Sequence, residues 1–275
     1  MGVLNVTPDS FFDGGQHLDP AAAVDHGWAL LEDGADILDV GGESSRPGSD
    51  PVPAEEELRR VIPVIKALRP RTGALLSVDT TKFEVARAAL EAGADIINDI
   101  GSAGLDPRLL SLAAERKAGF VLMHIKGVPK TMQIHPTYED VVAEVRAFLE
   151  EKLVVAEAYG LNRDRIILDP GIGFGKRLQD NLELIRRIED LASLGRPLLL
   201  GVSRKSFIGK LLNLPPEERL EGTIAAAVLS LARGAHILRV HDVRALRRAA
   251  LVADAVLAEP AAGSSDAEAR TPYVQ

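Results

Sequence analysis

The chain has 275 residues, no cysteine and a formal net charge of −8. The lack of cysteine excludes disulfides and thiolate metal sites, and the lack of a dense Lys/Arg run argues against a nucleic-acid partner. No long apolar run and no signal peptide is visible, so we predict a cytoplasmic protein with no membrane association.

Short apolar runs bounded by Gly or polar residues predict eight strands. In chain order they cover residues 2–6, 36–40, 74–78, 95–98, 120–124, 165–168, 197–202 and 236–240. Segments rich in Ala, Leu, Glu and Arg lie between most of them and predict helices, for example 21–33, 53–69, 82–92 and 183–194. Alternating strands and helices indicate parallel strands with right-handed connections.

Eight such units predict an α/β fold, a single-domain (β/α)₈ TIM barrel over residues 1–257. An open doubly wound sheet is the alternative architecture. The first strand begins almost at Met1, so we expect the lower end of the barrel to lack a cap. Residues 258–275 are rich in Ala, Gly, Ser and charge, which predicts a flexible C-terminal tail.

Every predicted strand ends in polar residues or is followed by them, at the end where a barrel carries its active site. They are Asn5 to Thr7, Asp39 to Glu43, Asp79 and Thr80, Asn98 and Asp99, His124, Asp169 to Gly171, Ser203 to Lys205, and His241 and Asp242. Some of them cap the next helix, and Thr80 is a better cap than Asp79 because a helix is predicted from Lys82. Polar ends on all eight strands indicate a site that draws on most of the barrel.

Several of these loops have the chemistry to bind a flat, anionic ligand. The loops at 7–15 and 41–49 are rich in Gly, Ser and Pro, which is typical of lids, and Arg46 could fold over an anion. A carboxylate fixed at Asp169 can accept two parallel N–H donors, such as those of an aminopyrimidine edge. A short helix predicted from Ser206 would offer free N–H groups to an anion beside Lys205.

The last strand adds two cationic or polar groups on one side, because Arg239 and His241 are two residues apart. Such a pair suits pyrophosphate, although a salt bridge from Arg239 and a capping role for His241 are the alternatives. The histidines lack metal-ligand spacing, so a hard cation such as Mg²⁺, held by phosphate and an oxygen of Asn5, is the more reasonable metal. The chain also lacks a Walker loop and the GxSxG motif of a serine hydrolase.

Taken together, these motifs resemble the dihydropteroate synthase family. The similar segments span most of the chain: 1–15, 39–48, 77–80, 97–99, 122–124, 169–176, 201–206 and 239–243. Differences from the usual family pattern occur at Ser45, at Ile172 and at the pair Ile125 and Lys126, and none of them removes a proposed catalytic group. The resemblance implies condensation of 6-hydroxymethyl-7,8-dihydropterin pyrophosphate with p-aminobenzoate, giving 7,8-dihydropteroate and pyrophosphate by SN1-like departure.

The resemblance also implies roles for individual residues. The catalytic groups would be Asp79, Lys205, Arg239 and His241. The pterin would be bound by Asp79, Asn98, Met123, Asp169, Gly201 and Lys205. Pyrophosphate would be bound by Asn5, Arg46, Arg239 and His241, with Asn5 also a ligand of Mg²⁺. The p-aminobenzoate side would comprise Ser45, Arg46, Pro47, Phe174, Lys205 and Ser206. The family resemblance further implies a homodimer.

Two other functions are compatible with part of this pattern. A pterin-binding methyltransferase barrel, which passes a methyl group from methyltetrahydrofolate to a corrinoid protein, would share Asp79, Asn98 and Asp169 but has no use for Arg46 or Arg239. A non-catalytic member of the family would not need Asn5, Arg46, Lys205, Arg239 and His241 to be intact.

Overall fold

The computed structural model describes residues 1–7, 20–44, 48–128 and 130–258. Within them the strands are β1 (Gly2–Asn5), β2 (Ile37–Gly41), β3 (Leu75–Asp79), β4 (Ile96–Asp99), β5 (Gly119–Met123), β6 (Ile166–Asp169), β7 (Leu199–Leu200) and β8 (Ile237–Leu238). The α-helices are α1 (Pro20–Glu32), α2 (Ala54–Leu68), α3 (Phe83–Ala92), α4 (Pro107–Arg116), α5 (Val141–Ala158), α6 (Leu178–Arg186), α7 (Ile188–Ala192), α8 (Ser206–Leu212), α9 (Leu220–Leu231) and α10 (Val243–Leu257). Short 3₁₀ turns cover Arg69–Arg71, Ser102–Gly104, Arg163–Arg165 and Pro216–Glu218.

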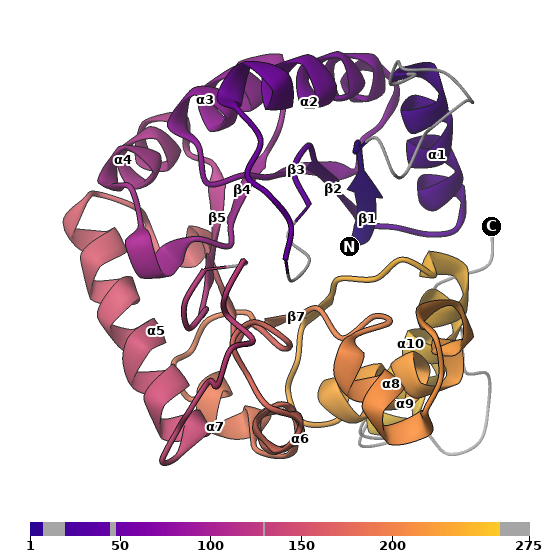
Figure 1. Ribbon diagram of the computed structural model, residues 1–275. Helices are drawn as coiled ribbons and strands as arrows, with labels where there is room; N and C mark the ends of the chain where they lie inside the picture. Colours follow the sequence, from indigo (N-terminus) through magenta and orange to yellow (C-terminus); the bar gives the residue numbers. More distant parts are fainter. Residues whose placement is uncertain (8–19, 45–47, 129, 259–275) are drawn as a thin grey trace, which may run out of the picture.

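The strands form a ring with the helices outside it (Figure 1). Strands β1 to β6 pair in parallel and in chain order, and β7 pairs in parallel with β8. Single parallel bridges join the two sheets, from Leu168 on β6 to Leu198 and from Gly2 on β1 to Val240. These bridges close the ring, so the predicted (β/α)₈ barrel is confirmed and the open doubly wound sheet is not.

The predicted strands all occur, but three predicted elements differ from the structure. Strands β7 and β8 are shorter than predicted, because regular pairing between them covers only two residues of each. The helix predicted over 183–194 was wrong as a single element. Its residues belong to α6 and α7, which are separated at Arg187, where the backbone angles of φ −115° and ψ 33° leave the helical region.

Glycines end three helices, each at the start of a Gly-Ala-Asp or Gly-Ala-His sequence. Gly34, Gly93 and Gly234 have positive φ angles of 97°, 108° and 101°. The space beside Gly93 is also filled, because an added Cβ would lie 2.6 Å from Cγ of Arg69. Such a turn needs glycine, and it directs the chain from the end of α3 into β4.

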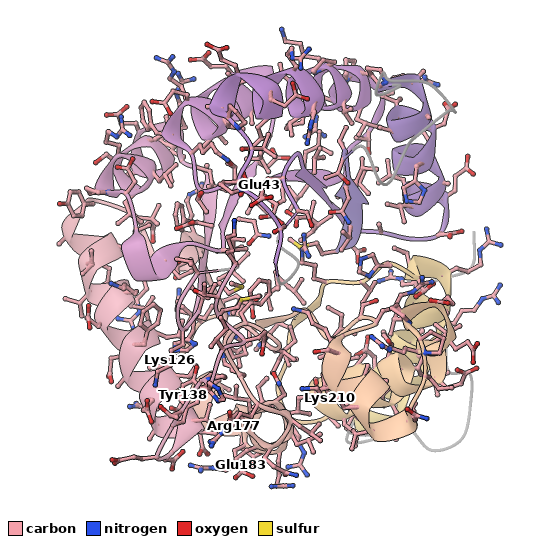
Figure 2. All side chains as sticks on the ribbon, viewed as in Figure 1. Glu43, Lys126, Tyr138, Arg177, Glu183 and Lys210 are labelled. Atoms are coloured by element: carbon pink, nitrogen blue, oxygen red, sulfur yellow. The ribbon has the colours of Figure 1, made fainter. Side chains whose placement is uncertain are left out.

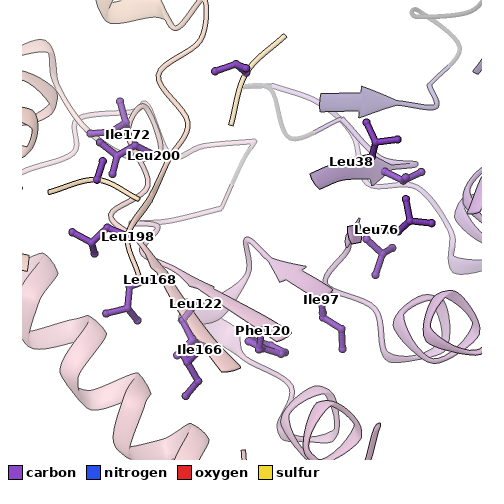
Figure 3. Packing of buried hydrophobic residues seen from close by; sticks show 14 of the residues in the cluster. Leu38, Leu76, Ile97, Phe120, Leu122, Ile166, Leu168, Ile172, Leu198 and Leu200 are labelled. Carbon is purple, nitrogen blue, oxygen red and sulfur yellow. The ribbon is translucent and has the colours of Figure 1, made fainter. Parts of the chain in front are cut away.

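Side chains alternate between the two faces of each strand and so form two separate hydrophobic clusters, one outside the ring of strands and one inside it. One set of side chains packs between the strands and the helices, and Figure 3 shows part of it, including Leu38, Leu76, Ile97 and Phe120. The other set points into the barrel, where the starts of the strands supply a small apolar cluster consisting of Met1, Ile37, Ile96, Val121 and Leu199, with Ile167 and Ile237 packed on it. The interior is therefore apolar only in its lower layer.

The lower end of the barrel contains a cavity of about 580 Å³, lined by strand starts such as Leu75, Gly119 and Ile166. Met1 is buried beside β8, where its ammonium group donates a hydrogen bond to the carbonyl of Leu238 at 2.9 Å. No helix in the described parts of the chain combines the length and apolar character that crossing a membrane requires. The predicted tail lies almost wholly outside the described residues, which end one residue after α10.

Candidate active site

A polar layer lies above the apolar layer inside the barrel. Moving two residues along each strand keeps a side chain on the same face, so Asp39 follows Ile37, Asn98 follows Ile96, and Arg239 follows Ile237. The strand register places Asp39 beside Ser77, and Met123 beside Asp169. The barrel interior thus changes from aliphatic to charged within one step along its strands.

Arg239 forms the centre of this layer. Its Nε donates to Oδ2 of Asp39 at 2.6 Å, and its Nη2 donates to Oδ2 of Asp79 at 2.8 Å. Asn98 completes the cluster, since its amide Nδ2 donates to the same Oδ2 of Asp39 at 3.0 Å. Arg239 therefore forms the salt bridges that were the alternative to pyrophosphate binding. These salt bridges connect β2 and β3 to the end of β8 across the barrel.

Burial and charge strongly perturb this cluster. Burial raises the pKa of Asp79; the guanidinium of Arg239 opposes that rise, and the neighbouring carboxylate of Asp39 adds to it. Burial acts to lower the pKa of Arg239, but Asp39 and Asp79 overcome it, so the net change is upward. One guanidinium therefore pairs with two buried carboxylates. The cluster has an excess of negative charge, so it attracts a further cation or a proton.

Two atoms of the layer have no hydrogen-bond partner among the described residues. They are Oδ1 of Asp39 and Oγ of Ser77, both buried and carried by register neighbours on β2 and β3. Buried polar atoms are nearly always satisfied by protein, water or ligand. These two atoms therefore mark unused hydrogen-bonding capacity inside the mouth.

Lys205 and Phe174 form the opposite side of the mouth. The Nζ atom of Lys205 donates to the carbonyl of Ile172 at 2.5 Å and lies 4.1 Å from the centre of the Phe174 ring. Burial lowers the pKa of Lys205 to about 8, and the carboxylate of Asp169 opposes this. Lys205 therefore stays mostly charged at neutral pH while being unusually easy to deprotonate for a lysine.

Asp169 is a fixed carboxylate, as the sequence predicted. It is buried at the end of β6, and its Oδ1 accepts a hydrogen bond from the backbone N–H of Gly171 at 2.7 Å. Burial raises the pKa of Asp169, and the Gly171 hydrogen bond and the nearby Lys205 oppose that rise. Its second oxygen remains available to a ligand in the mouth.

The other predicted site residues lie around this mouth. His241 contacts Ser203, whose Oγ lies 3.1 Å from Nδ1 of His241 and accepts its backbone N–H at 3.2 Å. Gly201 is adjacent to Arg239, because an added Cβ would lie 4.0 Å from Cβ of Arg239. Asn5 ends β1, Met123 is buried, and Ser206 is exposed at the start of α8, the helix predicted there.

Arg204 lies at the end of the seventh strand unit and has a structural role. Its guanidinium forms hydrogen bonds with both carboxylate oxygens of Asp242, at 2.9 and 2.5 Å. Thr80 also receives a backbone N–H, from Lys82 at 3.2 Å, although Lys82 precedes α3 rather than lying within it. These contacts stabilise the loops after β3, β7 and β8.

The predicted p-aminobenzoate residues Ser45, Arg46 and Pro47 lie outside the described residues. The chain on either side of them is held by an ionic network. Nζ of Lys82 lies 2.6 Å from Oε2 of Glu43 and 2.5 Å from Oε2 of Glu57, and Glu43 also accepts the N–H of Val52 at 2.9 Å. Figure 2 shows Glu43 on the inner side of the ring of helices.

Sequence reasoning missed several polar residues of the site. Asp39 was treated only as part of a strand end, although its position between apolar strand residues signals an inward side chain. Glu57, which was not singled out from the sequence, is fully buried in the acidic first turn of α2. His124 was treated as a polar strand-end residue and Lys176 as the last residue of a family-like segment, and no contact between them was predicted, yet Nζ of Lys176 lies 2.9 Å from Nδ1 of His124.

Comparison with known proteins gives a consistent family. The model of the family described as pterin binding enzyme matches residues 1–241. The dihydropteroate synthases of Synechocystis sp. and Escherichia coli are each 49% identical over 257 residues, covering 93% and 94% of this chain and 89% and 91% of theirs.

Solved structures agree with the sequence relatives. Xanthomonas albilineans dihydropteroate synthase with 4-aminobenzoic acid is 50% identical, with a TM-score of 0.88 and coverage of 94% of this chain and 93% of that one. The same protein in complex with 7,8-dihydropteroate gives a TM-score of 0.84 at 48% identity, with coverage of 94% and 93%. Because the family model matches most of the chain and these relatives are about half identical along nearly its whole length, the chain belongs to the dihydropteroate synthase family of pterin-binding enzymes.

Proposed function

We propose that this chain joins 6-hydroxymethyl-7,8-dihydropterin pyrophosphate to p-aminobenzoate, releasing 7,8-dihydropteroate and pyrophosphate for folate biosynthesis. The observation that carries the proposal is the Arg239 cluster, in which one guanidinium bridges Asp39 and Asp79 inside a barrel mouth that also holds Asp169 and Lys205. This set combines acceptors for an aminopyrimidine with cations for a diphosphate.

The pterin would occupy the polar layer of the barrel. Asp169 can accept the paired N–H donors of the 2-amino-4-oxo edge, because one of its oxygens is fixed by Gly171 and the carboxylate cannot turn away. Asp79 and Asn98 face the same space, with Met123 and Gly201 as neighbouring surfaces and Lys205 as a donor. The free hydrogen-bonding atoms of Asp39 and Ser77 would then be satisfied by ligand or by water that the ligand orders.

The diphosphate would lie between Asn5, Arg239 and His241, with Arg46 closing over it. Among the described residues, no three or more His, Cys, Asp or Glu side chains are placed so that they could hold a metal ion together. Mg²⁺ usually keeps few protein ligands and binds through substrate phosphate, so a single oxygen from Asn5 fits that donor set. When bound, the ion would neutralise charge that builds up on the departing diphosphate.

The chemistry needs no protein nucleophile. The C–O bond from the pterin CH₂ group to the diphosphate breaks, and the pterin ring delocalises the resulting positive charge. Arg239 and His241 stabilise the departing anion, while Asp79 and Asp169 stabilise the cationic ring. The amine nitrogen of p-aminobenzoate then forms the new C–N bond and releases its proton to solvent.

The p-aminobenzoate would lie toward Phe174 and Ser206, with Lys205 between them and the pterin. The ring of Phe174, already stacked on the Lys205 ammonium at 4.1 Å, provides a flat apolar wall. Ser45, Arg46 and Pro47 would complete this side. The xanthomonad relative solved with 4-aminobenzoic acid supports a site for this class of ligand in the family.

A two-substrate assay tests the function. We expect pyrophosphate release only when the dihydropterin pyrophosphate, p-aminobenzoate and Mg²⁺ are all present, with dihydropteroate formed in equal amount. Protein that binds pterin yet makes no dihydropteroate would contradict the proposal and favour the methyltransferase. No observation here favours that alternative, since the relatives named above are synthases.

We further propose a cytoplasmic homodimer. The exposed faces of α8, α9 and α10 carry a group of large apolar side chains that are 37–77% exposed: Leu211, Leu212, Leu229, Leu251, Val252, Val256 and Leu257. These three helices lie together on one side of the barrel (Figure 1). A concentration of apolar residues on one face is typical of an interface, and a second copy of the chain would cover it.

A further inference from the structure

A buried Lys–His pair lies beneath the loop between β6 and α6. Lys176 is 2% exposed, and its Nζ lies 2.9 Å from Nδ1 of His124, 3.1 Å from the carbonyl oxygen of Phe174 and 3.4 Å from that of His124. No described carboxylate forms an ion pair with it. Burying an ammonium group among neutral acceptors costs free energy of folding. The contacts of Lys176 do not neutralise its charge, so another role is needed to account for them.

These contacts join two loops. His124 follows β5, whereas Phe174 lies in the turn after β6, and Lys176 bonds to both. The loops also meet through their backbones, because a side chain at Gly171 would collide with the carbonyl of His124 and one at Gly175 with that of Lys126. Lys176 therefore holds together two loops whose glycines allow the close approach.

The turn that Lys176 supports carries three groups of the proposed site. The N–H of Phe174 donates to the carbonyl of Gly171 at 3.0 Å, which closes the turn. The N–H of Gly171 fixes the carboxylate of Asp169 at 2.7 Å, and the carbonyl of Ile172 accepts from Lys205 at 2.5 Å. A shift of this turn would move the pterin carboxylate, the Lys205 ammonium and the Phe174 ring together.

Neighbouring side chains support the same turn from outside. Tyr138 donates from its hydroxyl to the carbonyl of Gly175 at 2.8 Å, and Lys126 lies 4.1 Å from the centre of the Tyr138 ring. Figure 2 shows Lys126 and Tyr138 close together on the α5 side of the barrel. Asn181 accepts the N–H of Gly173 at 2.6 Å. Within this network, Lys176 connects the turn to His124, just after β5.

The ionisation of the pair agrees with this geometry. Burial lowers the pKa of His124 to about 3, and Lys176 adds to the effect, so the ring is neutral and can accept at Nδ1. Burial lowers the pKa of Lys176 to about 7, and Asp169 opposes the fall. The lysine is thus the donor and the histidine the acceptor.

We propose that Lys176, seated on His124, is a positioning residue that sets the 171–174 turn and thereby the joint placement of Asp169, Phe174 and Lys205. The proposal rests on the site roles given above for these three residues. It assigns Lys176 no contact with substrate, and it makes His124 part of the active site's support.

The test compares Lys176→Met with wild type in the full-length protein. We expect the dissociation constant for pterin and the KM for p-aminobenzoate to rise roughly 10- to 100-fold, the range found when groups that orient metal ligands are removed. Lys210→Met removes an exposed ammonium from α8 and should leave both constants unchanged. If Lys176→Met folds and keeps wild-type values for both, the positioning role is wrong.

A second pair of variants covers the case in which Lys176→Met does not fold. His124→Asn keeps an oxygen acceptor near the Nδ1 position, whereas His124→Leu removes it. We expect the Asn variant to stay close to wild type and the Leu variant to lose substrate affinity; equal constants for the two would overturn the proposal. Asp169→Asn separately tests the site itself, since unchanged pterin affinity in that variant would contradict the site assignment and not the role of Lys176.

Discussion

Arg239 pairs with the carboxylates of Asp39 and Asp79 and is proposed to bind the diphosphate, and a substitution can separate these two roles. Arg239→Ala should weaken binding of the pterin pyrophosphate about 10- to 100-fold, as loss of hydrogen bonds to a charged group predicts, and weaken binding of the free pterin alcohol less. Titration calorimetry with the two ligands measures both constants. Equal losses would mean that Arg239 only holds the two carboxylates in place.

Asp99 gives the stability of the protein a defined pH dependence. It is 1% exposed, and burial raises its pKa from 3.8 to about 6, against hydrogen bonds from Gly101 and Ser102. Between these two values the folded state binds more protons than the unfolded state, so this residue makes the protein less stable as pH rises through the window. The loss is complete above the folded-state value.

Asp99→Asn should remove that dependence. Relative to wild type, the variant should gain on the order of 3 kcal/mol of unfolding free energy between pH 4 and pH 7, from a shift of about two pKa units. Urea denaturation at a series of pH values measures this difference, with exposed Asp254→Asn as the control. A difference that does not change with pH would show that Asp99 is ionised equally in both states.

At the scale of single residues, the sequence predicted side chains at strand ends better than those inside strands or loops. Asp79, Asn98, Asp169 and Lys205 were singled out because polar residues at the end of an apolar run are conspicuous. Arg239 was singled out by alternation along the last strand, and the family resemblance added a specific role for each residue. Lys176 was not, because its burial depends on two loops packing together through glycine. That contact joins residues 52 positions apart and leaves no local pattern.

At the scale of elements, the ionic network of Lys82 connects α2, the start of α3 and the loop after β2. Glu57 is fully buried, one of its oxygens has no partner among the described residues, and the other lies 2.5 Å from Lys82. Lys82→Met would leave this carboxylate buried and unpaired. The expected loss of unfolding free energy is about 3–5 kcal/mol.

Chemical denaturation of a small set of variants tests that expectation. Lys66→Met, which removes an exposed lysine from α2, is the matched control and should change little. Adding Glu57→Gln to Lys82→Met should recover much of the loss, because the unpaired charge is then gone. A Lys82 variant as stable as the control would mean that Glu57 is protonated or hydrated without its partner.

The elements themselves were largely predictable from periodicity. The strands occur where short apolar runs end in polar residues, and glycines in the left-handed region, Gly34, Gly93 and Gly234, mark three helix ends. Two features were not predictable. The break at Arg187 interrupts a segment with good helical residues, and the short pairing of β7 with β8 depends on which backbone groups meet across the barrel.

At the scale of the whole molecule, the apolar surface on α8, α9 and α10 predicts self-association. Val252→Asp places a charge on a side chain that is 65% exposed and should shift the protein from dimer to monomer in sedimentation equilibrium. Val154→Asp, at a 64% exposed position on α5, is the control away from that surface and should leave the mass unchanged. A monomeric wild type, or a Val252 variant that remains dimeric, would contradict the proposed interface.

The closed ring was predictable from the number of strand and helix units, whereas its internal layering was only partly so. Alternation along a strand divides its side chains between two faces. The sequence does not show which face points into the barrel unless the position of one charged residue is known. Asp39 would have settled this for β2, because a carboxylate facing the outer helices would have no water and no cation.

The polar layer inside the barrel has a consequence for how the protein behaves before it meets its substrate. Most barrels of this kind fill their middle with aliphatic side chains, but here that volume contains Asp39, Asn98 and Arg239, with two polar atoms that lack a partner in the described part of the chain. A bound pterin would fill this polar layer and supply hydrogen-bond partners to it, and so would stabilise the folded protein. Folded protein should then accumulate where pterin is plentiful and be degraded faster where it is scarce, so that the abundance of the enzyme follows the supply of its own substrate.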